Sequence, residues 1–228
     1  MRSNNLMQTV ISLSTSLGIN AVPVGVVLAW GRSMETGMVL YFLETLLGIL
    51  LTVLFLVLRA PAEDPGYAEI SSGTTTIMTN GHSVRRAQAG NRRSLIEGYV
   101  IFSVGFAVIP MIFLLFWIFV ITHVDLAAAA VASGLSGIIV FQLVNFLAEL
   151  LFIRALTPAG ANSLVNQSMG RVAIIYVSMF AGMIIALVFA TRWFIIPFAL
   201  LKTIADLSFL FRKNRALHLQ LPEGAVSA

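Results

Sequence analysis

The chain has 228 residues, of which 58% are hydrophobic and only 11% are charged, and its mean hydropathy is +0.94. Soluble domains carry about 25% charged residues, so this composition excludes a water-soluble globular protein and indicates an integral membrane protein. The chain contains no cysteine, which excludes disulfides and thiolate metal sites. Its formal net charge of +4 is too small to indicate a nucleic-acid partner.

Six apolar segments are long enough to cross a bilayer, whose hydrocarbon core of about 30 Å takes about 20 helical residues. They lie near residues 8–30, 37–58, 95–121, 127–153, 172–190 and 193–211. The first segment is too long for a cleavable signal peptide, and only one basic residue, Arg2, precedes it. The sequence therefore predicts an all-α fold: a single transmembrane domain over residues 1–228, built as an integral membrane bundle of six transmembrane helices.

Basic residues predict the orientation of this bundle. With six spans both termini share one side, and that side receives Arg2, Arg59, Arg85, Arg86, Arg92, Arg93, Arg154, Arg171, Arg212, Lys213 and Arg215. The other side receives only Arg32 and Arg192. Because Lys and Arg accumulate in cytoplasmic loops, we expect both termini in the cytoplasm and the protein in the inner (cytoplasmic) membrane of the cell.

Residues 60–94 differ in composition from the rest of the chain. They are rich in Pro, Gly, Ser and Thr and show no apolar periodicity, which is typical of a flexible connection. We therefore expect a flexible cytoplasmic loop between the second and third spans. Its basic part, residues 85–93, could contact anionic lipid headgroups, although a role in fixing the orientation of the protein is the preferred interpretation.

Polar and charged residues lie deep inside the predicted spans. At about 1.5 Å of rise per residue, Lys202 lies about 14 Å from either edge of its span. Counted from the outer edges, Glu44 lies about 11 Å deep and Asn20 about 15 Å deep. Asp206 follows Lys202 by one helical turn on the same face, so these two can pair within one helix. Glu44 is the expected second partner of the ammonium, with Asn20 as a hydrogen-bond donor to a carboxylate.

A second layer of charges is predicted nearer the cytoplasmic side. It contains Asp206 and Glu149 and, close to the interface, Glu97, Arg154 and Arg171, while Gln142 and Asn145 lie between the layers. An isolated charge inside a span costs at least about 3 kcal/mol, so these side chains should face inward and pair. Arg154 and Arg171 are the expected counter-charges of the inner carboxylates, and the near balance of signs predicts a closed network.

Two interpretations of this buried polar network carry equal weight. Ionisable groups inside a membrane commonly form a proton or ion path. Alternatively, polar side chains fix the packing of helices by hydrogen bonds across helix pairs. A pore is less favoured than either, because the sequence has no ring of like charges and no filter-like loop.

The sequence predicts no catalytic residue and no metal site. His82, His123 and His218 are scattered, and none has metal-ligand spacing with another histidine or a helical carboxylate. No nucleophile elbow, phosphate-binding loop or dinucleotide fingerprint is present. An enzyme that uses Glu44 or Asp206 remains a third, less favoured alternative.

Several motifs give the chain a resemblance to a protein family. "NAVPVGVVLAW" (Asn20–Trp30) and "YFLETLLGIL" (Tyr41–Leu50) resemble the opening helices of an uncharacterised prokaryotic membrane-protein family, a domain of unknown function. "GRVAIIYVSMFAG" (Gly170–Gly182) and "LLKTIAD" (Leu200–Asp206) resemble its closing helices. Carried over by position, the family's polar pattern falls on Asn20, Glu44, Arg171, Lys202 and Asp206. Tyr176 stands where the family often has a histidine, so the resemblance implies neither histidine chemistry here nor an assigned activity.

For function we expect a non-enzymatic accessory or scaffold subunit, packed against other membrane-protein subunits or further copies of itself. The alternative is a small proton-coupled transporter or permease that uses the buried carboxylates. The sequence identifies no cofactor. A subunit should have the apolar flank of residues 106–120 covered by protein, whereas a transporter needs a water-accessible cavity that reaches Glu44 or Lys202.

Overall fold

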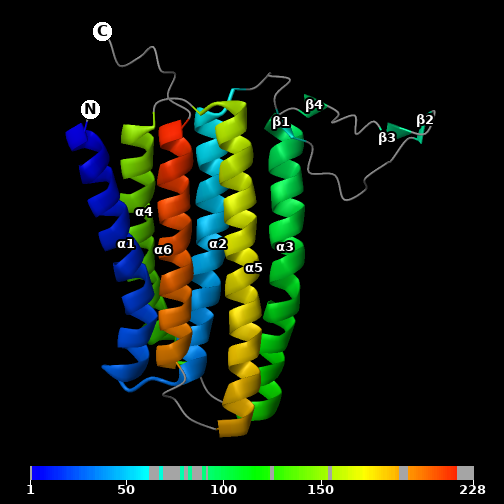
Figure 1. Ribbon diagram of the computed structural model, residues 1–228. Helices are drawn as coiled ribbons and strands as arrows, with labels where there is room; N and C mark the ends of the chain where they lie inside the picture. Colours follow the sequence, from blue (N-terminus) through cyan, green and yellow to red (C-terminus); the bar gives the residue numbers. More distant parts are fainter. Residues whose placement is uncertain are drawn as a thin grey trace.

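In the residues that the computed structural model describes, the protein forms a bundle of six long α-helices, arranged as Figure 1 shows. The structure describes residues 2–61, 67–68, 78–79, 82–83, 89–90, 92–123, 126–153, 156–189 and 195–219. The helices are α1 (Arg2–Leu28), α2 (Met34–Arg59), α3 (Arg92–Phe116), α4 (Ala128–Phe152), α5 (Pro158–Phe189) and α6 (Ile195–Leu219), and a π-helical turn, η1 (Trp117–Thr122), continues α3. The prediction of an all-α bundle is therefore confirmed.

Short strands occur between α2 and α3. β1 (Tyr67–Ala68) pairs with β4 (Ala89–Gly90), and β2 (Met78–Thr79) pairs with β3 (His82–Ser83), both in antiparallel register. The predicted loop of residues 60–94 is shortened at its end, because α3 already begins at Arg92. Most of the loop lies outside the described residues, so its flexibility stays a prediction.

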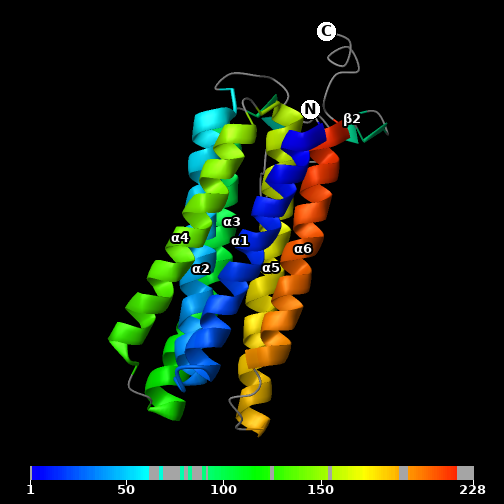
Figure 2. The same cartoon turned by 90° about the vertical axis from the view of Figure 1, so that its left-hand side faces the viewer.

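Among the described residues, four helical stretches are long and apolar enough to cross a membrane: Thr9–Leu28, Met34–Arg59, Arg92–Ile121 and Ala128–Phe152. α5 and α6 lie alongside them in the same bundle (Figures 1 and 2). α1 begins and α6 ends at the same end of the bundle, which we call the terminal end; the other end, where α1 ends and α6 begins, is the opposite end. Successive helices thus run in alternating directions.

Four of the six helices enclose a common interior. α1 packs against α2 and α6, and α5 packs against the same two helices. α4 packs against α1 and α2, whereas α3 packs against α2 and α5, so both lie outside this four-helix core. The candidate site lies inside the core.

The terminal end of α2 is held by arginine side chains. The last carbonyls of a helix lack intrahelical donors and carry a partial negative charge. Arg92 Nη1 donates to the carbonyls of Val57 (3.1 Å) and Ala60 (2.9 Å), and Arg59 Nη2 donates to the carbonyl of Leu150 on α4. These basic residues, which the sequence analysis assigned to orientation, therefore also tie α2 to α3 and α4.

The fifth helix begins earlier than predicted. The sequence placed its span near 172–190, whereas α5 begins at Pro158. Leu164, Gln167, Ser168 and Arg171 have the i, i+3, i+4, i+7 spacing of one helical face, and all four line an internal cavity. Because this face borders a polar cavity, the first half of α5 lacks the apolar residues on which the prediction relied.

Candidate functional site

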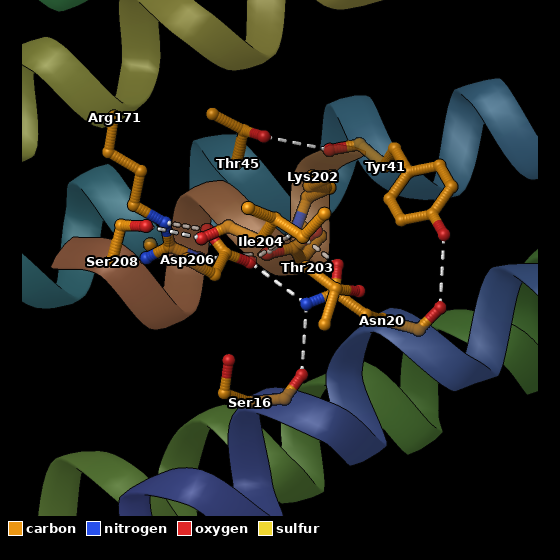
Figure 3. Close-up of polar contacts among 12 residues, drawn as sticks. Ser16, Asn20, Tyr41, Thr45, Arg171, Lys202, Thr203, Ile204, Asp206 and Ser208 are labelled. Atoms are coloured by element: carbon orange, nitrogen blue, oxygen red, sulfur yellow. Dashed lines mark hydrogen bonds and ion pairs between the residues drawn. The ribbon is translucent and has the colours of Figure 1, made fainter. Parts of the chain in front are cut away.

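Four charged side chains in the interior form a closed ring of ion pairs. Figure 3 labels three of them, Arg171, Lys202 and Asp206. Lys202 Nζ on α6 lies 2.8 Å from Glu44 Oε2 on α2 and 2.9 Å from Asp206 Oδ2. Arg171 on α5 reaches the same two carboxylates, with Nε 2.6 Å from Asp206 Oδ1 and Nη2 3.3 Å from Glu44 Oε1. Each cation therefore contacts both carboxylates, and the four formal charges sum to zero. We call these four residues the ionic ring.

Three of the four side chains of the ionic ring are almost completely buried. The side chains of Lys202, Glu44 and Asp206 are 0%, 1% and 3% exposed. Glu44 Oε1 accepts a hydrogen bond from Lys202 Nζ at 3.1 Å, whereas Oε2 meets the ammonium as an ion pair without hydrogen-bond geometry. Removing an ion from water costs several kcal/mol even after relaxation, so only close pairing of opposite charges makes this burial tolerable.

Asn20 connects α1 to the ionic ring through both ends of its amide (Figure 3). Its Oδ1 accepts a hydrogen bond from Lys202 Nζ at 2.7 Å, and its Nδ2 donates to Asp206 Oδ2 at 2.9 Å and to the carbonyl of Ser16 at 3.0 Å. The amide therefore serves the ammonium and a carboxylate at once. All four core helices therefore contact the ionic ring: α2, α5 and α6 contribute its charged side chains, and α1 contributes the amide of Asn20.

Tyr41 is a contact of the ring that the sequence analysis did not single out as a site residue. Its hydroxyl donates to the backbone carbonyl of Asn20 at 3.0 Å. The centre of its ring lies 5.4 Å from Lys202 Nζ, within the range of a cation–π contact. Because Tyr41 precedes Glu44 by three residues, it lies on the same face of α2, and this spacing could have identified it.

The structure brings five of the predicted residues together. Asn20, Glu44, Arg171, Lys202 and Asp206 lie in direct contact, as described above. Arg171, which the sequence assigned to the interface, joins both predicted layers because it contacts Glu44 as well as Asp206.

The remaining predicted charges lie elsewhere. Glu149 accepts a hydrogen bond from Asn145 Nδ2 at 3.1 Å. It lines the cavity and is not a member of the ionic ring. Glu97 pairs with Arg93 at 2.7 Å, with side chains 55% and 84% exposed, so this pair lies on the surface. Arg154 lies outside the described residues.

A cavity of about 160 Å³ lies on the terminal side of the ionic ring. Its wall mixes apolar and polar side chains, and the polar ones include Ser12, Ser16, Gln142, Asn145, Glu149 and Gln167. Two members of the ring, Arg171 and Asp206, also line it. The Arg171 side chain is 35% exposed, whereas the Lys202 side chain is fully buried, so Arg171 is the most exposed member of the ring.

The opposite side of the ring is apolar. The buried side chains there include Met38 and Tyr41 on α2, Met179 on α5, and Ile195 and Phe198 on α6. The rings of Tyr41 and Phe198 meet edge to face, with centroids 5.0 Å apart. We call these five residues the apolar layer. The ionic ring thus lies between a cavity with polar groups in its wall on one side and a packed apolar layer on the other.

Among the residues that the structure describes, no group of three or more His, Cys, Asp or Glu side chains is arranged to hold a metal ion. A proton added to either carboxylate of the ionic ring would leave two cations facing one anion. The ring can therefore respond to protonation by rearranging its contacts.

Fold and site together define a class of protein: a helical bundle with membrane-length apolar helices around a buried, charge-balanced ion-pair network. The chain belongs to a family of unknown function, DUF6498, whose family model covers residues 2–222. This match confirms the resemblance to an uncharacterised family that the sequence motifs indicated. Searches of the curated proteins and of the solved structures found no match.

Charge balance in the ionic ring predicts a specific stability pattern. Lys202→Met leaves Arg171 facing two carboxylates and should lower the free energy of unfolding by about 3–5 kcal/mol, the usual cost of breaking a buried pair. Adding Glu44→Gln restores neutrality, because one cation and one carboxylate remain, and should recover most of this loss. Thermal and denaturant unfolding of the purified protein in detergent measures both effects.

Glu97→Gln is the matched control, because it removes a carboxylate from an exposed ion pair and should leave the unfolding midpoint nearly unchanged. If the double variant were no more stable than Lys202→Met alone, charge balance would not be what stabilises the ring.

Proposed function

We propose that this protein is a small proton-coupled transporter or permease of the inner membrane, with six membrane-spanning helices and both termini in the cytoplasm. The observation that carries the proposal is the position of the cavity. It lies between the ionic ring and the terminal end and is lined by Arg171 and Asp206, so a solute in it would touch the charged network directly.

The lengths and positions of α5 and α6 support six spans. They have 32 and 25 residues, which corresponds to about 48 and 37 Å of helix, more than the roughly 30 Å of a hydrocarbon core. Both lie beside the four apolar helices. The excess of Lys and Arg on the terminal side supports a cytoplasmic location of the termini.

The asymmetry of the core supports transport over a purely structural role. A transporter holds its site open to one side at a time while the other side is closed. Here the cavity lies on the terminal side of the ionic ring, and the apolar layer closes the opposite side. Protonation of Glu44 or Asp206 would unbalance the ring, which packs α2, α5 and α6 together, and so would favour a different arrangement of these helices.

The absence of cysteine from the chain allows a direct test of cavity access. Ser16→Cys places a thiol on the cavity wall, whereas Ser103→Cys places one at a fully buried position of α3. A membrane-impermeant thiol reagent should modify Ser16→Cys in inside-out vesicles but not in intact cells, and should leave Ser103→Cys unmodified in both. Labelling of Ser16→Cys in intact cells, or in neither preparation, would contradict a cavity open to the cytoplasm.

Proton coupling is tested in proteoliposomes with a pH-sensitive dye inside and an imposed potassium-diffusion potential. The wild-type protein should admit protons faster than empty liposomes do. The double variant Glu44→Gln/Lys202→Met keeps the ring neutral but removes one protonatable carboxylate, so its proton flux should fall to the level of empty liposomes. Glu97→Gln is the control and should retain the wild-type flux.

Wild-type flux that does not exceed the empty-liposome level, or an equal flux in the folded double variant, would each contradict this function. Size-exclusion chromatography and the unfolding midpoint establish that the variant is folded.

An accessory or scaffold subunit is the second candidate, and the outer face of α3 favours it. Ile101, Ile109 and Ile112 are 73%, 67% and 60% exposed, and Phe119 on η1 is 67% exposed. These side chains form an apolar flank that a companion membrane protein could cover. α3 packs within the bundle mainly against α2 and α5, which leaves this flank free for such a contact.

Crosslinking separates a protein-covered flank from a lipid-covered one. Ile109→Cys, carrying a short thiol-to-amine crosslinker in native membranes, should form a discrete adduct with one companion chain if the flank is an interface. Ile204→Cys on α6 is the control, since it is similarly exposed at 61% but lies on another helix. Equal behaviour of the two variants, with no discrete adduct from Ile109→Cys, would speak against the scaffold role.

A further inference from the structure

Arg171 brings unused hydrogen-bond donors to the wall of the cavity. Of the five N–H groups that a guanidinium carries, one on Nε donates to Asp206 and one on Nη2 donates to Glu44. Among the residues that the structure describes, the remaining N–H groups, including both on Nη1, have no acceptor. Nη1 is also not one of the buried polar atoms that lack a partner, so solvent reaches it. Because Arg171 lines the cavity, an acceptor oxygen of a solute there can bind to Nη1.

Gln167 supplies an acceptor one helical turn away from these donors. It precedes Arg171 by four residues on α5, so the two side chains lie on one face of the helix with their Cβ atoms about 6 Å apart. Gln167 also lines the cavity. Its Nε2 donates to Ser163 Oγ at 3.0 Å, whereas its Oε1 has no donor within the described part of the chain and is not a buried atom. A donor and an acceptor thus lie side by side in the wall.

The charged groups of the wall already have partners. Asp206 contacts both cations of the ionic ring, Arg171 and Lys202. Glu149 accepts a hydrogen bond from Asn145 and has a further interaction of its own. The ionic ring is neutral, so a solute with a net charge would place an unbalanced charge beside it, which is costly in a buried site. The wall therefore favours a solute without net charge.

We propose that the cavity binds a small neutral amide, whose carbonyl oxygen accepts from Arg171 Nη1 and whose N–H donates to Gln167 Oε1. An amide group presents an acceptor and a donor next to each other, as this wall requires. Apolar side chains of the same wall, among them Phe146 and Leu164, can contact the rest of the solute. The volume of about 160 Å³ is close to that of a cavity that holds one benzene molecule, about 150 Å³.

This inference rests on the proposed transport function and names its substrate class, but binding can be measured without transport. Butyramide is the probe, because it is similar to benzene in size and carries N–H groups next to its carbonyl. Purified wild-type protein in detergent should bind radiolabelled butyramide saturably in equilibrium dialysis.

Two variants remove one side of the site each. Gln167→Met keeps a similar side-chain volume but removes the acceptor, and should weaken butyramide binding at least about tenfold, which corresponds to about 1.4 kcal/mol. Arg171→Lys keeps the charge of the ionic ring but removes the guanidinium donors, and should weaken binding by at least as much. Glu97→Gln on the surface is the control and should bind butyramide as the wild type does.

A second amide separates the two hydrogen bonds. N,N-dimethylacetamide is an isomer of butyramide that keeps the carbonyl but has no N–H. Gln167→Met should bind it as tightly as the wild type does, whereas Arg171→Lys should bind it more weakly. If Gln167→Met weakened the binding of both amides equally, the loss would not reflect a hydrogen bond to Gln167, and the proposal would be wrong.

Competing solutes test the chemical class. Butyrate and butylammonium are similar in size to butyramide but carry a net charge, so each should displace the probe at least about tenfold less well than unlabelled butyramide does. Displacement by either ion at the concentration at which butyramide acts would assign the site to a charged solute and overturn the proposal.

Two further results separate this inference from the transport function. Absence of saturable binding by the wild type, or unchanged butyramide binding by both folded variants, overturns the amide site even if proton flux is observed. Saturable, Gln167-dependent binding without proton flux would retain the site and overturn proton-coupled transport. Gln167→Met keeps the test decisive if Arg171→Lys fails to fold, because Gln167 is not a member of the ionic ring.

Discussion

The balance of charge in the ionic ring is the constraint on which the rest of this structure depends. Within a bilayer, apolar side chains gain little by leaving lipid for a helix interface, so polar contacts and close packing hold helices together. Here α2, α5 and α6 each contribute at least one charge to the ring, and α1 contributes the amide of Asn20. Because every ring member contacts two others of opposite sign, none can be lost without leaving a buried charge partly unpaired. The same four helices form the core, with α3 and α4 packed outside it.

Much of this arrangement could be predicted because helical geometry converts position in the sequence into depth and direction. A rise of about 1.5 Å per residue placed Asn20, Glu44 and Lys202 at similar depth before any fold was known. The four-residue spacing of Lys202 and Asp206 placed both on one face, and the structure contains that pair at 2.9 Å. A buried ammonium group needs carboxylates close to it. Few carboxylates lie at the depth of Lys202, so depth alone left few candidate partners.

The parts that escaped prediction have a common physical cause. Apolar periodicity detects helices that face lipid or a dry core, but the first half of α5 faces a polar cavity. Its start was therefore placed too late, and Arg171 was assigned to the interface. With α5 beginning at Pro158, Arg171 lies 13 residues into the helix (171 − 158), about 20 Å along its axis, where it reaches the ring. The cavity itself depends on how five helices pack together, and no local pattern in the sequence records that.

The two interpretations of the buried network, structural packing and a proton path, describe the same contacts. Each carboxylate of the ionic ring binds one cation from α5 and one from α6. A proton on either carboxylate therefore weakens its ion pairs with α5 and with α6 at once. The free energy of protonation is thus coupled to the free energy of packing these helices. Arg171 and Asp206 make this coupling accessible, because both also line the cavity. A solute that changes the surroundings of the guanidinium changes the affinity of the ring for protons, and by thermodynamic linkage the proton changes the affinity for the solute.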